Sequence, residues 1–454
     1  MQDMTKGPIP GHVVRMAMPI TFGLLFQAAY ILIDRYFVTR QGDDAMAGVV
    51  SAGNLQFLVM GLTQVLAVGT TTVIAHAVGR KSREDANLAF NQSLLMGALC
   101  ALMTLLAGYA LATPYMHLLG SDAGTKAAGI AFLRWFVPGL ALQFVMIPMG
   151  SALRGTGINA PGMIVQIATV LINALLAPVL IAGWITGHPF GVAGAGMATS
   201  ISVFIGVVLL TLYFAKLETY VAFDPASMRP RLATWWRMLR IGLPAGGEFM
   251  LMFLYMFVIL QIIKPFGASA QAGFGIGSAV MQSIFLPAMA IAFAVSPIAG
   301  QNVGARLHDR VRETFRHAAI MSSIAMLALT LFCQWSPEAL VHPFATEHNQ
   351  ESLKIAAGFL RIISLNFVAQ GIIFTCSGMF QALGNTVPAM LSSATRLLTF
   401  AIPGIMLAHR AGFELQHLWY LSVATVTLQA CTSLLLLRGQ FRRRLVEAPA
   451  ASVS

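Results

Sequence analysis

The chain has 454 residues and a formal net charge of +11, yet only 10% of its residues are charged and 57% are hydrophobic. Soluble domains carry about 25% charged residues, so a mean hydropathy of +0.75 excludes a soluble globular protein. It predicts an all-α polytopic membrane protein. No Gly-Lys-Ser/Thr follows a glycine-rich stretch, which excludes ATP as the direct driver. The histidines show no HxxxH or HExxH spacing, so we expect no enzyme.

In chain order, long apolar runs predict twelve membrane-spanning helices, because each run can cross about 30 Å of hydrocarbon. The first run begins close to Met1 and has no small-residue cleavage site after it, so we interpret it as an uncleaved span. The predicted spans are residues 13–38, 49–78, 88–112, 129–153, 162–185, 191–215, 237–263, 272–303, 313–334, 355–382, 388–409 and 415–437.

The sequence contains an internal duplication. Arg15-Met16-Ala17-Met18-Pro19 recurs as Arg240-Ile241-Gly242-Leu243-Pro244, and Phe132-Leu133-Arg134 recurs as Phe359-Leu360-Arg361. Six helices per copy bring each copy back to its starting side, which predicts parallel repeats related by a pseudo-twofold axis along the membrane normal. We therefore expect a six-helix lobe at 1–215, a cytoplasmic linker at 216–236, a second six-helix lobe at 237–440, and a basic and then disordered tail at 441–454.

Lysine and arginine predict the orientation. Far more of them fall in the segments that share a side with the N-terminus than in the opposite segments. By the positive-inside rule, both termini are expected in the cytoplasm. The basic excess then sets topology at an anionic leaflet, and we expect no nucleic-acid partner.

Acidic residues inside the predicted spans are few. Glu313 is the first residue of a span, and only Asp34 and Glu248 lie further inside one. A carboxylate at the centre of a span costs roughly 2.5–3.5 kcal/mol, so it normally faces a cavity or a partner. Gln27, Tyr30 and Asp34 follow an i, i+3, i+7 spacing that places them on one helix face. The alternative is that Asp34 lies at the outer end of its helix, neutralised by Arg35.

The second copy has its own chemistry, because the repeat partner of Glu248 is Gly23 and that of Asp34 is Ile259. Arg396 is the basic residue that we place deep in a span. We expect it to pair with Glu248 directly or through water. Two alternatives remain open: Glu248 lies alone in a wet cavity and contacts a cationic substrate, or Arg396 packs against carbonyl groups elsewhere.

The chain resembles the multidrug and toxic compound extrusion (MATE) family over about residues 10 to 440. The resemblance rests on the six-plus-six helix register, on a proline in the first turns of helices one and seven, and on four motifs. These motifs are Ile33-Asp34, the loop from Val78 to Ala86, Ala152-Leu153-Arg154-Gly155-Thr156-Gly157, and Phe380-Gln381-Ala382-Leu383-Gly384-Asn385.

The resemblance implies two six-helix lobes that form a V, and cation-driven export. It also implies that Asp34, Asn173, Thr199 and Tyr30 couple transport to a cation. Many relatives carry an aspartate where this chain has Ala177. We therefore favour H⁺ over Na⁺, with a weaker sodium site at Asp34, Asn173 and Thr199 as the alternative, and no other metal or cofactor.

For the substrate path we expect a set of residues within the spans: Gln27, Glu248, Met252, Tyr255, Gln282, Gln370 and Arg396. The expected function is antiport of amphipathic, cationic drugs or toxic compounds by rocking of the two lobes. A lipid-linked oligosaccharide flippase of the same superfamily is the alternative. We expect a monomer among membrane lipids in a bacterial inner membrane, whose partners are small amphipathic molecules.

Overall fold

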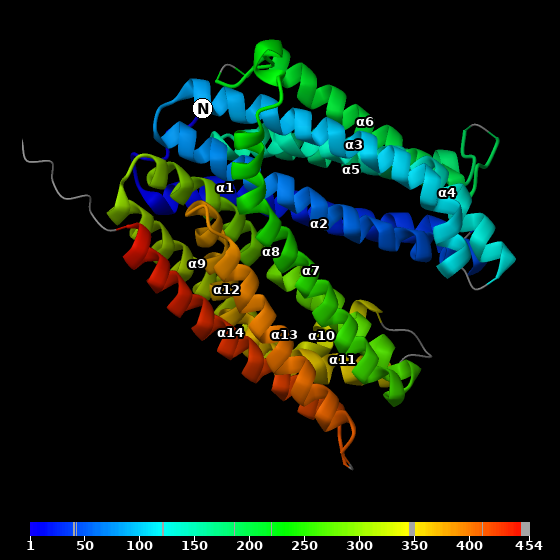
Figure 1. Ribbon diagram of the computed structural model, residues 1–454. Helices are drawn as coiled ribbons and strands as arrows, with labels where there is room; N and C mark the ends of the chain where they lie inside the picture. Colours follow the sequence, from blue (N-terminus) through cyan, green and yellow to red (C-terminus); the bar gives the residue numbers. More distant parts are fainter. Residues whose placement is uncertain are drawn as a thin grey trace, which may run out of the picture. The chain divides into compact units, whose positions relative to one another are not determined.

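The structure is a computed structural model. It describes residues 1–39, 41, 43–119, 122–185, 187–218, 220–344, 350–410 and 412–445, without the side chains of 29–36, 39, 43 and 119. Within these ranges the regular elements are helices, and twelve of the helical stretches are long and apolar enough to cross a membrane. The predicted all-α, twelve-span fold is thus confirmed (Figure 1).

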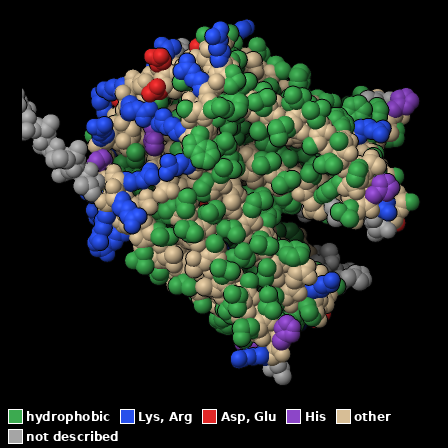
Figure 2. Space-filling view, viewed as in Figure 1, with side chains coloured by type: hydrophobic (Ala, Val, Ile, Leu, Met, Phe, Trp, Pro, Cys, Tyr) green, Lys and Arg blue, Asp and Glu red, His purple; other side chains and the backbone are tan. Residues whose placement is uncertain are grey.

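The chain forms two compact units, Met1–Asp3 with Phe22–Gly242, and Met4–Thr21 with Leu243–Ser454. Hydrophobic side chains cover most of the face shown in Figure 2, and charged side chains gather near helix ends, as a lipid-embedded protein requires. The α-helices are α1 (Ile9–Thr39), α2 (Asp43–Gly79), α3 (Arg83–Leu119), α4 (Ala123–Gly155), α5 (Ala160–Ile181), α6 (Val192–Lys216), α7 (Leu232–Ile263), α8 (Ala268–Gly304), α9 (His308–Trp335), α10 (Pro337–Val341), α11 (Gln350–Ile363), α12 (Phe367–Ala382), α13 (Val387–Ala408) and α14 (Leu415–Arg444).

In the first unit, α4 is the central helix and packs against α2, α3 and α6, while α5 packs against α6. In the second unit, α8 packs against α9, α11 and α12, and α14 packs against α11, α12 and α13. Glycine brings α2 and α7 into close contact in the first unit. A Cβ at Gly242 would overlap the Val65 carbonyl oxygen, and one at Gly69 would lie 2.6 Å from the Met238 oxygen.

Backbone turns of the first copy recur at the equivalent positions of the second copy. Lys81 and Arg306 follow α2 and α8, and both adopt a left-handed conformation with φ of 58° and 60°. Gly157 and Gly384 do the same after α4 and α12, with φ of 80° and 68°. Each pair also repeats its pattern of backbone hydrogen bonds. The duplicated sequence therefore folds into duplicated turns.

One predicted span contains a change in helix type. The span predicted at 355–382 lies within a single helical stretch, Gln350–Ala382, in which a 3₁₀ turn at Ser364–Asn366 joins α11 to α12. Helix α9 supplies donors to carbonyls at this turn: Thr330 Oγ1 donates to the Ser364 oxygen at 3.1 Å, and Gln334 Nε2 donates to the Arg361 oxygen at 2.6 Å. Released carbonyls need such partners in a membrane, because hydrocarbon offers none.

The linker predicted at 216–236 contains a 3₁₀ turn (Pro225–Met228) and the first residues of α7. It is held against α3 by buried amide side chains. The side chain of Gln92 makes four of the hydrogen bonds. It donates to the Ser227 and Arg229 oxygens at 2.6 and 2.7 Å, and it accepts from the Arg231 amide and from Trp235 Nε1. The linker is thus a docked segment of the first unit.

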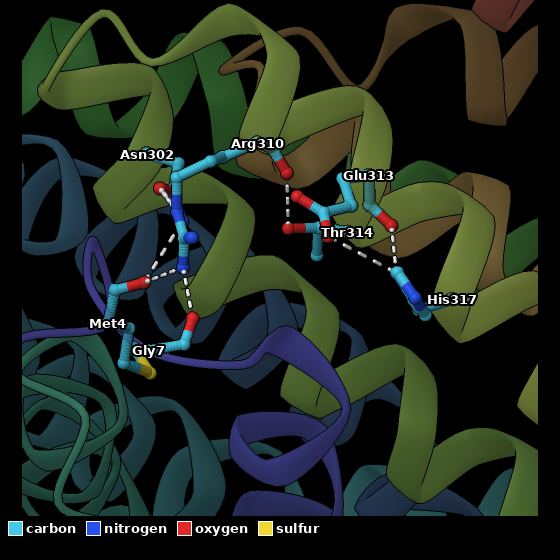
Figure 3. A network of polar contacts seen from close by, with 7 residues as sticks. All are labelled: Met4, Gly7, Asn302, Arg310, Glu313, Thr314 and His317. Atoms are coloured by element: carbon cyan, nitrogen blue, oxygen red, sulfur yellow. Dashed lines mark hydrogen bonds and ion pairs between the residues drawn. The ribbon is translucent and has the colours of Figure 1, made fainter.

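The N-terminal segment makes a comparable set of bonds within the second unit (Figure 3). Arg310 Nη2 donates to the Gly7 oxygen at 2.9 Å, and Arg310 Nε donates to Asn302 Oδ1 at 3.2 Å. Asn302 Nδ2 in turn donates to the Met4 oxygen at 3.3 Å. The segment that precedes the first helix of each copy is therefore fixed through its backbone.

Candidate transport sites

The first candidate site lies in the first unit, between α5 and α6. Asn173 Nδ2 donates to Thr199 Oγ1 at 3.3 Å, so the structure brings these two predicted residues together. Asn173 is 4% exposed, and its Oδ1 is buried with no hydrogen-bond partner among the described atoms. Ala177, one turn further along α5, is fully buried and adds no oxygen. The site therefore offers one unused amide oxygen.

Helix α1 approaches α5 in the same unit. Gln166 Nε2 donates to Gln27 Oε1 at 3.2 Å, and a Cβ at Gly23 would overlap the side chain of Met163. Gln27 thus faces α5. The side chains of Tyr30 and Asp34, the other members of the predicted polar face, lie outside the described residues.

The second candidate site lies in the second unit around Glu248 of α7. Ser377 Oγ on α12 donates to Glu248 Oε2 at 3.0 Å. A small pocket at this position is formed by residues of α7, α12, α13 and α14, namely Glu248, Ile373, Ser377, Phe380, Ala389, Ser392, Gln429 and Ser433. Sequence reasoning did not identify these serines, because an isolated hydroxyl in an apolar run commonly bonds its own helix.

Arg396 of α13 lies near two other predicted residues. Its Nη1 donates to Gln370 Oε1 at 3.3 Å, and its guanidinium carbon lies 4.1 Å from the centre of the Tyr255 ring. Tyr255 is itself fixed by a 3.0 Å hydrogen bond between its hydroxyl and Ser422 Oγ, and by packing against Phe400. Three predicted substrate-path residues are thereby brought together.

The expected direct pair of Glu248 and Arg396 is absent from the described chain. The ion pairs within 4.0 Å in these ranges join other residues at helix ends, and Glu248 is bonded to Ser377 instead. The physical reason is helix register. Arg396 lies beside Tyr255, and Tyr255 follows Glu248 by seven residues on α7. The positions of Glu248 and Arg396 are therefore separated by about 10.5 Å along the axis of α7.

Two predicted substrate-path residues do not join either site. Met252 is 52% exposed on α7. Gln282 of α8 is also exposed and makes no hydrogen bond that the structure describes. An exposed position of a span can face lipid or a path. Met252 lies one turn after Glu248 on α7, but the described contacts of Glu248 and Arg396 are with other residues.

Known proteins resemble this chain over nearly its whole length. It is 25% identical to the probable multidrug resistance protein YoeA of Bacillus subtilis over 425 residues, which cover 92% of this chain and 91% of that protein. It is 24% identical to the probable multidrug resistance protein NorM of Thermotoga maritima, covering 96% and 94% of the two chains.

The fold is also shared with solved structures. A MATE family transporter of the MOP superfamily, solved in an outward-facing conformation, superposes with a TM-score of 0.91 and 21% identity over 98% of both chains. The MatE family profile matches this chain twice, at residues 19–179 and 244–407. The two matches start 225 residues apart, from 19 to 244, as the internal duplication requires. The chain therefore belongs to the MATE family of transporters.

Proposed function

We propose that this protein is a secondary active exporter of amphipathic, cationic compounds that exchanges them for protons. The observation that carries the proposal is the double MatE match on a chain with twelve candidate spans. The names of the relatives support it, since the matched proteins are called multidrug resistance or multidrug export proteins. They do not favour the flippase alternative.

The donor set of the first unit supports protons over sodium. Sodium needs several oxygen ligands, and in the described part of this site we find only the amide oxygen of Asn173 and the hydroxyl of Thr199. Ala177 contributes none. We place the exchangeable proton on Asp34, because it is the one acidic residue within the predicted spans of the first copy.

The second unit supports a role in contacting cationic substrates. In the described part of this unit, Glu248 is the one acidic residue that lies in the middle of a long helix. Its hydrogen bond from Ser377 occupies one carboxylate oxygen and leaves the other for a ligand. A bacterial inner membrane with cytoplasmic termini is the location that fits this role and the distribution of lysine and arginine.

Transport by inverted vesicles tests the proposal. We expect vesicles that contain the protein to accumulate a fluorescent amphipathic cation such as ethidium when their lumen is made acidic. A sodium gradient imposed at constant pH should drive no accumulation, and vesicles without the protein provide the control. Accumulation driven by sodium alone would reject proton coupling, and accumulation under neither gradient would reject the export function.

A further inference from the structure

In the described chain, Arg396 is a cation without a carboxylate partner. It lies near the middle of α13, nine residues after Val387, and its guanidinium makes one hydrogen bond there, to Gln370. The acids of the second unit other than Glu248 that the structure describes lie near helix ends: Asp309, Glu313, Glu338, Glu351 and Glu414. An arginine inside a membrane span is costly unless it serves a partner or a ligand.

The guanidinium is held in a fixed orientation. The Tyr255 ring covers one of its faces at 4.1 Å, Gln370 takes Nη1, and the tyrosine hydroxyl is anchored on Ser422. This leaves the edge formed by Nε and Nη2, where Nε is buried without a hydrogen-bond partner among the described atoms. Two parallel N–H groups along such an edge match the two oxygens of a carboxylate. Because Nε is enclosed, a ligand reaches this edge only after neighbouring side chains move.

The acidic site lies two helical turns away on the same helices. Tyr255 follows Glu248 by seven residues on α7, and Gln370 precedes Ser377 by seven residues on α12. Positions seven apart share a helix face, so the two sites are stacked along α7 and α12 with a separation of about 10.5 Å. The second unit therefore presents a carboxylate at one level and, within the described chain, an unpaired guanidinium at the next.

We propose that Arg396 binds a carboxylate group of the transported substrate, so that the second unit recognises zwitterionic amphiphiles, with their ammonium group at Glu248 and their carboxylate at Arg396. This inference rests on the proposed export function and adds the substrate class. A compound that carries both charges satisfies both residues. A compound with an ammonium group alone leaves the guanidinium without a partner.

Matched ligands test the inference on the purified full-length protein. The probes are one fluorescent amphipathic amine with a carboxylate several bonds away and its methyl ester, which differ only in that charge. We expect the wild-type protein to bind the acid about tenfold more tightly than the ester, because hydrogen bonds to charged groups are the stronger ones. Equal affinities, or tighter binding of the ester, would overturn the inference whatever the variants do.

Variants then assign the effect to the residue. Arg396→Gln should abolish the preference for the acid and leave the affinity for the ester unchanged, and Arg396→Lys should retain part of the preference, because it keeps the charge and loses the planar edge. Arg410→Gln, which removes an exposed arginine after the end of α13, should change neither affinity. A preference for the acid that persists in Arg396→Gln would overturn the inference. So would equal losses for both ligands, which would show a structural role.

Three further results distinguish an inorganic anion at Arg396, a wrong substrate class and a failed export function. If replacing chloride with a bulky organic sulfonate removes the binding of both ligands, Arg396 holds an inorganic anion and the inference is wrong. If proton-driven export of the ester persists while the acid is neither bound nor exported, the substrate class is wrong and the export function stands. If neither ligand nor ethidium is exported, the export function itself fails.

Discussion

At the scale of single residues, the proposed coupling to protons depends on Asp34. Asp34 is the only acidic residue within the predicted spans of the first copy. Its helix, α1, also contains Gln27, whose side chain contacts α5. We expect Asp34→Asn to abolish proton-driven export while the protein still inserts and folds, because asparagine cannot carry the exchangeable proton. Asp309→Asn, which removes an exposed acid at the start of α9, should retain export. Export by Asp34→Asn with unchanged pH dependence would show that Asp34 has no coupling role.

The two charges of the second unit should act independently when no substrate is bound. Glu248 and Arg396 have different partners, Ser377 and Gln370, and residues more than about 7–10 Å apart without shared partners have additive effects to within about 0.5 kcal/mol. We expect the changes in thermal stability of Glu248→Gln and Arg396→Gln to add in the double variant. A double variant more stable than the sum predicts would indicate the direct or water-bridged pair that the sequence suggested.

Sequence reasoning identified the charged residues of this unit better than it identified their partners. An arginine or glutamate in an apolar run is visible from the sequence alone, because its insertion is costly. Its partner depends on how each helix is rotated about its axis and on its register against its neighbours. Tyr255 and Ser377 lie on faces that only the packing of α7, α12 and α13 determines. The expected direct pair is therefore absent from the described chain, although both members lie within spans as predicted.

At the scale of elements, the close approach of α2 and α7 depends on Gly242. A Cβ there would overlap the Val65 carbonyl oxygen, whereas a Cβ at Gly53 of α2 would meet nothing within 4 Å. We expect Gly242→Ala to lower the melting temperature, because backbone groups must separate to make room. Gly53→Ala is the matched control. It should be neutral or slightly stabilising, because alanine favours a helix by up to about 1 kcal/mol over glycine. Equal melting temperatures for the two variants would show that α2 and α7 can separate at little cost.

The docking of the linker on α3 depends on Gln92. This side chain is fully buried and bonds Ser227, Arg229, Arg231 and Trp235. We expect Gln92→Leu to release the segment, because each buried polar group left without a partner costs about 1–3 kcal/mol.

Limited trypsin digestion measures this release, since Arg231 lies in the docked segment and is followed by Leu232, whereas Pro230 protects the bond after Arg229. Cleavage after Arg231 should accelerate about tenfold or more in Gln92→Leu. Gln261→Leu, an exposed position on α7, should be cleaved like the wild type. Equal cleavage of all three proteins would show that other contacts hold the linker.

The elements themselves followed from hydropathy, because a membrane span must be long and apolar wherever it occurs. Hydropathy did not reveal the 3₁₀ turn at Ser364–Asn366, which lies inside the span Gln350–Ala382. Carbonyls at this turn receive hydrogen bonds from Thr330 and Gln334, which are about thirty residues earlier on α9. Nothing in the local sequence reveals such long-range hydrogen bonds, so the sequence predicts the span and not the turn within it.

At the scale of the whole molecule, the duplication constrains topology. Lys81 and Arg306 occupy equivalent left-handed positions 225 residues apart, after α2 and α8, and the two family matches begin with the same separation. If each copy crosses the membrane six times, equivalent turns of the two copies must emerge on the same side. The high density of lysine and arginine near both turns predicts that this side faces the cytoplasm.

Cysteine accessibility tests this topology directly. Arg80→Cys and Arg306→Cys, each introduced after the four native cysteines are replaced by alanine, should react with a membrane-impermeant maleimide in inverted vesicles and remain protected in intact cells. Lys126→Cys, near the start of α4, should show the reverse pattern, because one further span separates it from Arg80. Labelling of positions 80 and 306 from opposite sides would mean an odd number of crossings between them. It would replace the parallel repeats with inverted ones, although the duplicated turns and the family match would remain.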